Sequence, residues 1–288
     1  MTKGTSFEAM GTTFELLLDV ENGIDVSPSF NAVEREVRRL ERILSRFDEG
    51  SELSRLNRAG TLEVGPELVE IVGRALAART ETDGRFDPTV HDALVAAGYD
   101  RPFAEIPADQ PATGADSCAC GGAVRVDVAS GRVDLEPGVR LDLGAIAKGW
   151  TADRVLPILA AHGPALVNAG GDVAACGRTW PIRIEAAGDL TVAIECGGLA
   201  TSGVDRRRWR TGGTERHHLI DPRTGTSAAT DLLTVTAAAE TAADAEVLAT
   251  SLYLAGSIER AAAEADARSF PAVLVARDGD VVQAGGLR

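Results

Sequence analysis

Residues 141–153 form the densest group of small and polar residues in the chain, Leu-Asp-Leu-Gly-Ala-Ile-Ala-Lys-Gly-Trp-Thr-Ala-Asp. The pattern predicts a strand over 141–143 that carries Asp142, then a turn of small residues, and a helix that begins near Gly144 and carries Lys148. A helix N-terminus attracts anions, and the lysine adds a full positive charge. The connection between the predicted strand and helix therefore suits a phosphate-bearing ligand. The same residues also fit an ordinary strand–helix connection with a lysine on the surface.

Two more segments combine small residues with groups that could bind a ligand or carry a proton. Residues 168–172, Asn-Ala-Gly-Gly-Asp, predict a tight turn, which is also common without any function. His217 and His218 are adjacent in a chain with 4 histidines. Histidine titrates near neutral pH, so one of the pair is a candidate proton acceptor. A strand is predicted over 217–220, in which the two rings face opposite sides, so at most one faces a given pocket.

A pair of oxygen-bearing side chains lies further along the chain. Glu246 and Thr250 are one helical turn apart in a helix predicted over 243–255. Carboxylate and hydroxyl oxygens suit a hard cation such as Mg²⁺. Taken alone, the same spacing describes an ordinary pair on a helix surface.

The helices that must position these groups are indicated by apolar residues at helical intervals. Phe30, Val33, Val37 and Leu40 follow Ser27-Pro28, where Ser27 is the expected N-cap and Pro28 the first helical residue. Further helices are predicted after Gly65-Pro66, after Asp87-Pro88 and after Ser257. Pro157 predicts a kink or an end in the helix that begins near Gly144.

Strands are predicted over 13–20, 164–168, 181–186, 191–195, 217–220 and 232–238, with hairpins over 124–135 and 271–284. Residues 101–123 lack periodicity and are expected to form a surface loop. Hairpins alternate irregularly with helices, which predicts an α+β fold with a mixed, largely antiparallel sheet core and packed helices. A length of 288 residues corresponds to one large domain or two small ones. We predict a single domain over 1–288, which could contain two interleaved lobes.

The charge of the chain excludes some classes of partner. The sequence has 43 acidic and 29 basic residues, giving a net charge of −14. Such a protein repels nucleic-acid phosphates and anionic lipids. We therefore expect no nucleic-acid partner and no membrane insertion, and an anionic ligand needs local cations. G-x-G-x-x-G and Walker A motifs are absent, so any nucleotide site is built differently.

Taken together, the segments resemble the ApbE family, the FAD:protein FMN transferases. The resemblance covers nearly the whole chain in the family's order. Each matching segment is weak singly, but jointly they are highly specific. The segments are 9–12 (Ala-Met-Gly-Thr), 44–48 (Leu-Ser-Arg-Phe-Asp), 51–57, 84–90 (Gly-Arg-Phe-Asp-Pro-Thr-Val), 142–153, 168–172, 201–203 (Thr-Ser-Gly) and 218–225.

The resemblance implies an enzyme that binds FAD and Mg²⁺, moves FMN onto a Ser or Thr hydroxyl of a partner protein, and releases AMP. It implies that His218 is the general base acting on that hydroxyl. Magnesium ligands are implied to be the Ala145 carbonyl, Glu246 and Thr250. The residues implied to contact FAD are Asp142, Lys148, Met10, Phe47, Arg85, Phe86, Asp87 and Ile220.

The chain departs from the family pattern at two positions. The family's late helix usually reads Asp-Ala-x-x-Thr, whereas here Glu246 stands four residues before Thr250 and Asp244 lies two residues earlier. We expect Glu246, not Asp244, to bind the metal. Position 47 is often Tyr in relatives, and Phe47 keeps the stacking surface without the hydroxyl.

Two other functions remain open on the sequence. An FAD pyrophosphatase would use water as the acceptor and yield FMN and AMP, and a non-catalytic FAD-binding module would leave FAD unchanged. No convincing acceptor segment occurs within the chain, so a redox partner protein is expected to be modified in trans.

The expected cellular location and cysteine state follow from simple patterns. No apolar segment follows a basic N-terminal one, so we expect no signal peptide and a cytoplasmic protein. The spacing of Cys118, Cys120, Cys176 and Cys196 matches no zinc pattern, and we expect reduced thiols.

Overall fold

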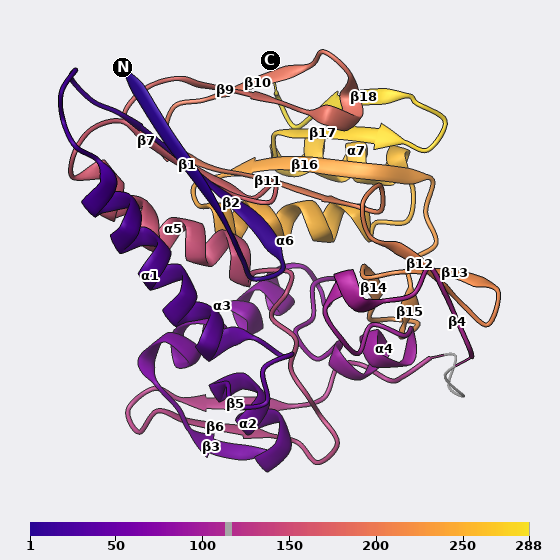
Figure 1. Cartoon of the computed structure of the whole chain (residues 1–288). Coiled ribbons are helices and arrows are strands. Elements are labelled where there is room, and N and C mark those ends of the chain that lie inside the picture. Colours follow the sequence, from indigo (N-terminus) through magenta and orange to yellow (C-terminus); the bar gives the residue numbers. More distant parts are fainter. Residues whose placement is uncertain (113–116, 288) are drawn as a thin grey trace.

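An eight-stranded antiparallel sheet forms the centre of the computed structural model, which describes residues 1–112 and 117–287. Every neighbouring pair in it is antiparallel, which confirms the predicted α+β fold. Both ends of the chain contribute strands, and the two terminal hairpins occupy opposite edges (Figure 1). In sheet order, the strands are β1 (Thr2–Ala9), β2 (Thr12–Asp19), β7 (Ala165–Ala169), β8 (Val173–Cys176), β11 (Gly197–Gly203), β16 (Leu232–Ala239), β17 (Ala272–Ala276) and β18 (Val281–Ala284).

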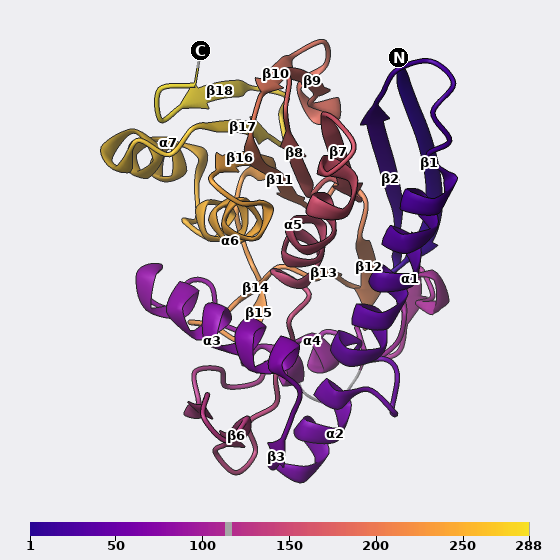
Figure 2. The ribbon, with the colours of Figure 1, turned by 90° about the vertical axis from the view of Figure 1, so that its left-hand side faces the viewer.

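Helices cover one face of this sheet (Figure 2). Helix α5 (Ala147–Ala160) packs on β7 and β8, α6 (Ala242–Tyr253) on β11 and β16, and α7 (Ile258–Arg268) on β17 and β18. Helix α6 is buried on nearly all sides because it contacts the sheet on one side and α5 and α7 on others. Helix α1 (Ser27–Leu44) packs outside α5 and buries the apolar stripe predicted for it, including Phe30, Val37 and Leu44.

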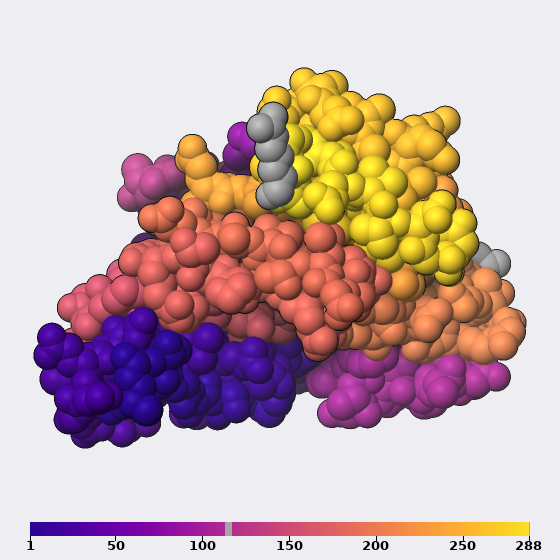
Figure 3. All heavy atoms as spheres, turned by 90° about the horizontal axis from the view of Figure 1, so that it is seen from above, coloured from indigo at the N-terminus to yellow at the C-terminus, as the bar shows by residue number. Residues whose placement is uncertain are grey.

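A short hairpin covers part of the opposite face. Strands β9 (Trp180–Arg183) and β10 (Thr191–Ile194) pair antiparallel. Trp180 and Ile194 pack there against Val173 of the large sheet. Seen from above, this hairpin region separates the N-terminal strands, in indigo, from the C-terminal strands, in yellow (Figure 3).

Smaller elements lie beyond the helical face. Helices α2 (Glu52–Ala59) and α3 (Pro66–Glu81) accompany a three-stranded sheet of β3 (Thr61–Glu63), β6 (Arg132–Leu135) and β5 (Val124–Asp127). One hydrophobic cluster joins these elements to α1, α5 and α6 through Leu40, Ile71, Trp150 and Val247. The remaining elements are α4 (His91–Ala96), η1 (Phe103–Glu105), β4 (Asp109–Gln110), η2 (Glu185–Ala187), β12 (Arg208–Thr211), β13 (Thr214–His217), β14 (Ile220–Asp221) and β15 (Thr226–Ser227).

The predicted strand over 141–143 is wrong. The segment has no strand partner, and a side chain from α2 forms hydrogen bonds with its main chain instead. Asn57 accepts a hydrogen bond from the Leu141 N–H at 2.7 Å and donates one to the Leu141 carbonyl at 2.8 Å. The following helix begins at Ala147, so Lys148 lies in its first turn.

Other boundaries also differ from the predictions. Helix α5 continues to Ala160, so Pro157 does not end it. Helix α1 already includes Ser27, and its N-cap is Val26 without a side-chain hydrogen bond. The predicted strand 217–220 is interrupted at 218–219. The predicted loop over 101–123 contains η1 and β4, and its residues 113–116 lie outside the described part of the chain.

Asn57→Ala is expected to lower the free energy of unfolding by about 2–6 kcal/mol. It leaves two polar groups of the fully buried Leu141 unpaired, at about 1–3 kcal/mol each. Urea unfolding followed by fluorescence measures the loss. Asn31→Ala is the matched control, because Asn31 is exposed on α1. An equal, small effect of both variants would show that Asn57 does not hold the segment.

The described residues contain no helix long and apolar enough to cross a membrane. Cys118, Cys120, Cys176 and Cys196 are all free thiols, as predicted.

Candidate active site

A cavity of about 1000 Å³ opens where the large sheet meets α1, α5 and α6. Its wall is formed by the turn between β1 and β2, the segments before α5 and after β7, the end of β11 and one side of α6. All twelve residues named for the site from the sequence line it. They are Met10, Phe47, Arg85, Phe86, Asp87, Asp142, Ala145, Lys148, His218, Ile220, Glu246 and Thr250.

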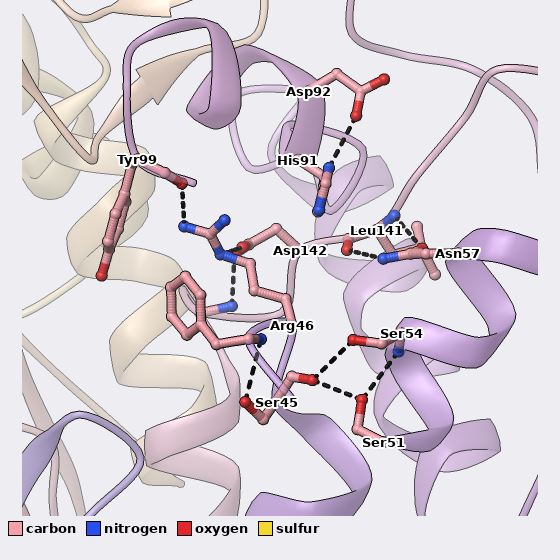
Figure 4. A network of polar contacts seen from close by, with 12 residues as sticks. Ser45, Arg46, Ser51, Ser54, Asn57, His91, Asp92, Tyr99, Leu141 and Asp142 are labelled. Atoms are coloured by element: carbon pink, nitrogen blue, oxygen red, sulfur yellow. Dashed lines mark hydrogen bonds and ion pairs between the residues drawn. The ribbon is translucent and has the colours of Figure 1, made fainter. Parts of the chain in front are cut away.

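One wall is fixed by an ion pair between Arg46 and Asp142 (Figure 4). Arg46 Nε lies 2.7 Å from Asp142 Oδ2, and both side chains are less than a tenth exposed. The other Asp142 oxygen accepts the Gly144 N–H at 2.8 Å. The Arg46 guanidinium also lies 4.2 Å from the Phe47 ring centroid and 4.5 Å from that of Tyr99. Asp142 is therefore held rigidly beside an aromatic surface.

Serine hydroxyls hold the corner that carries Arg46 and Phe47. Ser51 and Ser54 at the start of α2 both donate to the Ser45 carbonyl, at 2.6 and 3.2 Å (Figure 4). Ser51 also caps α2 by accepting the Ser54 N–H. Phe47 is left 37% exposed at the cavity, where a flat ligand can stack on it.

Lys148 lies between two buried carboxylates. Its Nζ is 3.0 Å from Asp172 Oδ2, pairs closely with Glu246 Oε1, and donates to the Gly144 carbonyl at 3.0 Å. The second Glu246 oxygen accepts the Gly149 N–H at 2.9 Å, in the first turn of α5. The acceptor at this helix N-terminus is thus the side chain of Glu246.

The charges in this group shift one another's pKa values. Burial lowers the pKa of Lys148, but Asp172 and Glu246 outweigh burial and raise it overall, so the lysine is charged. Burial, together with the charge of Asp172, raises the pKa of Glu246 to about 8. The positive charge expected from Lys148 is present, but two acidic side chains already compensate it.

The turn after β7 delivers Asp172 to this group. Gly170 and Gly171 have φ of 70° and 111°, and Asn168 Oδ1 accepts the Gly171 N–H at 2.8 Å. The segment is therefore the tight, side-chain-capped turn that the sequence allowed, and it also places a carboxylate in the cavity. Asp172 and Arg46 were not among the predicted site residues, although both lie in the segments that carried the family resemblance.

Helix α6 presents Glu246 and Thr250 to the cavity. Thr250 Oγ1 lies 2.9 Å from the Ser202 hydroxyl. Asp244 lies outside the cavity lining and pairs with Arg74 at 3.0 Å, with its side chain 52% exposed.

Two glycines let α6 approach closely. A Cβ at Gly149 would lie 2.4 Å from the Ala242 carbonyl oxygen, and one at Gly198 would lie 2.2 Å from the Ala242 N.

The two adjacent histidines have different environments. His218 lines the cavity, and burial, Arg207, His217 and Lys148 all hold its pKa well below the usual range, so the ring is neutral at pH 7. His217 lies in the core with its Nε2 3.0 Å from the Ala228 carbonyl oxygen. Burial lowers the pKa of His217 to about 4. We therefore expect substitution of His217 to lower the free energy of unfolding.

The remaining predicted residues line the cavity while holding the structure together. Arg85 pairs with Glu264, and Asp87 pairs with Arg79 at 3.1 Å. Phe86 and Ile220 are almost fully buried. Met10 follows β1 in a left-handed conformation with φ of 51°, and its N–H donates to Glu41 Oε1 at 2.6 Å.

Sequence comparison shows that the chain belongs to the ApbE family, whose model matches residues 10–274. The FAD:protein FMN transferase of Vibrio cholerae is 28% identical over 297 residues, covering 94% of this chain and 86% of that protein. The chain is 35% identical to the Treponema pallidum transferase over 48% of its own length. It is 32% identical to a Klebsiella pneumoniae transferase over 51% of its own length. These two alignments cover 43% and 49% of the relatives, so in them the chain spans about half the relatives' length.

Solved structures share the fold. The crystal structure of the ApbE protein from Thermotoga maritima superposes with a TM-score of 0.87 at 26% identity, covering 99% of this chain and 97% of that one. The apo form of the flavinyl transferase ApbE from Pseudomonas stutzeri gives a TM-score of 0.82 at 23% identity, covering 99% and 95%. The predicted family and fold are confirmed.

Proposed function

We propose that this chain transfers FMN from FAD to a Ser or Thr hydroxyl of an acceptor protein and releases AMP. The observation that carries the proposal is the convergence of all twelve predicted residues, from distant parts of the chain, on one cavity. The transferases named among its relatives support the same activity.

Each of several cavity residues has a separate role in the proposed reaction. His218, neutral at pH 7, accepts the proton of the acceptor hydroxyl. The acceptor oxygen forms a bond to the FMN phosphorus. The bond from that phosphorus to the bridging oxygen breaks, and its electron pair leaves with AMP. Phe47, beside Arg46 and Asp142, offers a flat surface for a ring of FAD.

The donor set fits a magnesium ion. Glu246 and Thr250 carry oxygen atoms and line the cavity, and Ala145 is on the same lining. Hard oxygen donors are those that Mg²⁺ prefers. The described residues contain no group of three or more His, Cys, Asp or Glu side chains suited to a metal, so phosphate oxygens and water must supply further ligands. When bound, the ion neutralises charge on the diphosphate.

The pH dependence of transfer tests the state of His218. Because its pKa lies below 6.5 in the folded protein, the ring is neutral, and able to accept a proton, at every pH above that folded value. With Mg²⁺ held at saturation, which keeps Glu246 ionised, activity is expected to stay constant as pH falls from 8 to 6.5 and to decline only at lower pH. A profile of kcat/KM for the acceptor measures this. A decline centred above pH 6.5 would contradict the assignment.

Product analysis separates this function from its alternatives. The chain is incubated with FAD, Mg²⁺ and candidate acceptor proteins, and nucleotides are separated by chromatography. Transfer yields AMP without an equal amount of free FMN. Equal amounts of AMP and FMN would identify an FAD pyrophosphatase, and unchanged FAD a binding module.

The partner follows from the same proposal. A redox protein modified in trans is the expected acceptor, and FAD is the expected nucleotide. A cytoplasmic location and a single domain over 1–288 remain predictions from the sequence.

A further inference from the structure

The cations of the cavity wall are mostly paired with carboxylates. Arg46 pairs with Asp142 and Arg85 with Glu264. Arg206 pairs with Glu185. Lys148 contacts both Asp172 and Glu246, so that group carries more negative than positive charge when both acids are ionised. None of these side chains supplies an uncompensated positive charge.

Arg207 is different. It lies in the connection between β11 and β12, on the cavity lining, and its Nη2 donates to the Gly11 carbonyl at 3.1 Å. A carbonyl accepts a hydrogen bond but does not neutralise a guanidinium. Within residues 1–112 and 117–287, no carboxylate forms an ion pair with Arg207. Arg183, also on the lining, forms no ion pair with the same described residues but is exposed on β9.

The position of Arg207 links it to the reacting groups. Its connection bridges the cavity from the end of β11, which carries Ser202, to the turn that follows Met10. Arg207 shares the cavity lining with Lys148 and with His218, the candidate base.

We propose that Arg207 is a further catalytic residue, which binds the diphosphate of FAD and stabilises negative charge on it as AMP leaves. The inference rests on the proposed function for its reaction, and on the unpaired charge of Arg207 for its ligand. A guanidinium presents up to five N–H donors in a planar fork that matches phosphate oxygens. The Gly11 carbonyl uses one of these donors, which leaves others for the ligand.

The test compares ligands that carry a diphosphate with one that does not. Calorimetry measures the affinity of the full chain for FAD, ADP and riboflavin. In Arg207→Gln, the affinities for FAD and ADP are expected to fall about 10–100-fold, the loss of one charged hydrogen bond, while that for riboflavin is unchanged. The rate of AMP formation is expected to fall about 100-fold. Arg207→Lys should recover part of both losses, because the charge remains and the fork is lost.

Arg208→Gln is the matched control, since it removes the same charge from the next residue, which is exposed and off the cavity lining. It is expected to behave as the parent. Equal effects of the two variants, or an equal loss of riboflavin affinity in Arg207→Gln, would overturn the proposal. A parent that binds FAD but never forms AMP contradicts the proposed reaction, while the diphosphate comparison still decides the role of Arg207 in binding. A parent that binds neither FAD nor ADP contradicts both.

Discussion

His218→Ala is expected to lower the rate of FMN transfer by about 10²–10⁴-fold while the affinity for FAD stays within a few-fold of the parent. A general base acts when the acceptor hydroxyl loses its proton, so its loss affects the reaction far more than the binding of the nucleotide. The ring is neutral and lines the cavity, as this role requires. Single-turnover formation of AMP gives the rate, and calorimetry gives the affinity.

The control for this variant is His162→Ala, because His162 is exposed and lies off the cavity lining. His217 does not serve, since it is buried against the Ala228 carbonyl and its removal leaves that group unpaired. Unchanged transfer by His218→Ala, with normal transfer by His162→Ala, would exclude His218 as the base.

The second large effect concerns the metal. Glu246→Gln is expected to reduce Mg²⁺-dependent turnover more than about 100-fold. Loss of a residue that only hydrogen-bonds to a metal ligand already lowers metal affinity or activity about 10–100-fold, and Glu246 is proposed to bind the metal itself. The variant keeps the side-chain volume, and Lys148 keeps its ion pair with Asp172. Glutamine keeps only one of the two acceptor oxygens that Lys148 and the Gly149 N–H use, so the free energy of unfolding of the variant is measured beside its activity. Activity measured against Mg²⁺ concentration gives the result.

Asp244→Asn supplies the comparison on the same helix. Its carboxylate is exposed and pairs with Arg74, and exposed pairs contribute about 0–1 kcal/mol. We expect its activity and Mg²⁺ dependence to match the parent. If Asp244→Asn lost the metal dependence and Glu246→Gln kept it, the ligand would be Asp244 and the helical spacing argument would fail.

Sequence patterns predicted elements best where local spacing determines them. The apolar stripe of α1 and the cap of α7 at Ser257 depend on residues within one or two turns, and both are confirmed. Strand β11 was not predicted, because its sequence, Gly-Gly-Leu-Ala-Thr-Ser-Gly, does not alternate β-branched and polar residues as a typical strand does. Its glycines are used for close packing instead, since Gly198 allows α6 to lie against the sheet.

Contacts between distant segments explain what the sequence could not show about the site. No local pattern indicates that Asn57 binds the main chain of Leu141, 84 residues away, and so replaces a strand partner. The compensation of Lys148 by Asp172 and Glu246 likewise depends on the turn after β7 and on α6. Family resemblance pointed to residues that line one cavity, but only the fold shows which charges there remain unpaired.

The central claim is tested most directly by the mass of an acceptor protein. A candidate redox acceptor is co-expressed with the parent chain or with His218→Ala, purified, and measured by intact-protein and fragment mass spectrometry. We predict that the acceptor gains one FMN, linked through phosphate to a Ser or Thr, with the parent and not with the variant. An unmodified acceptor beside free FMN and AMP, across the redox proteins that share the chain's compartment, would contradict transfer.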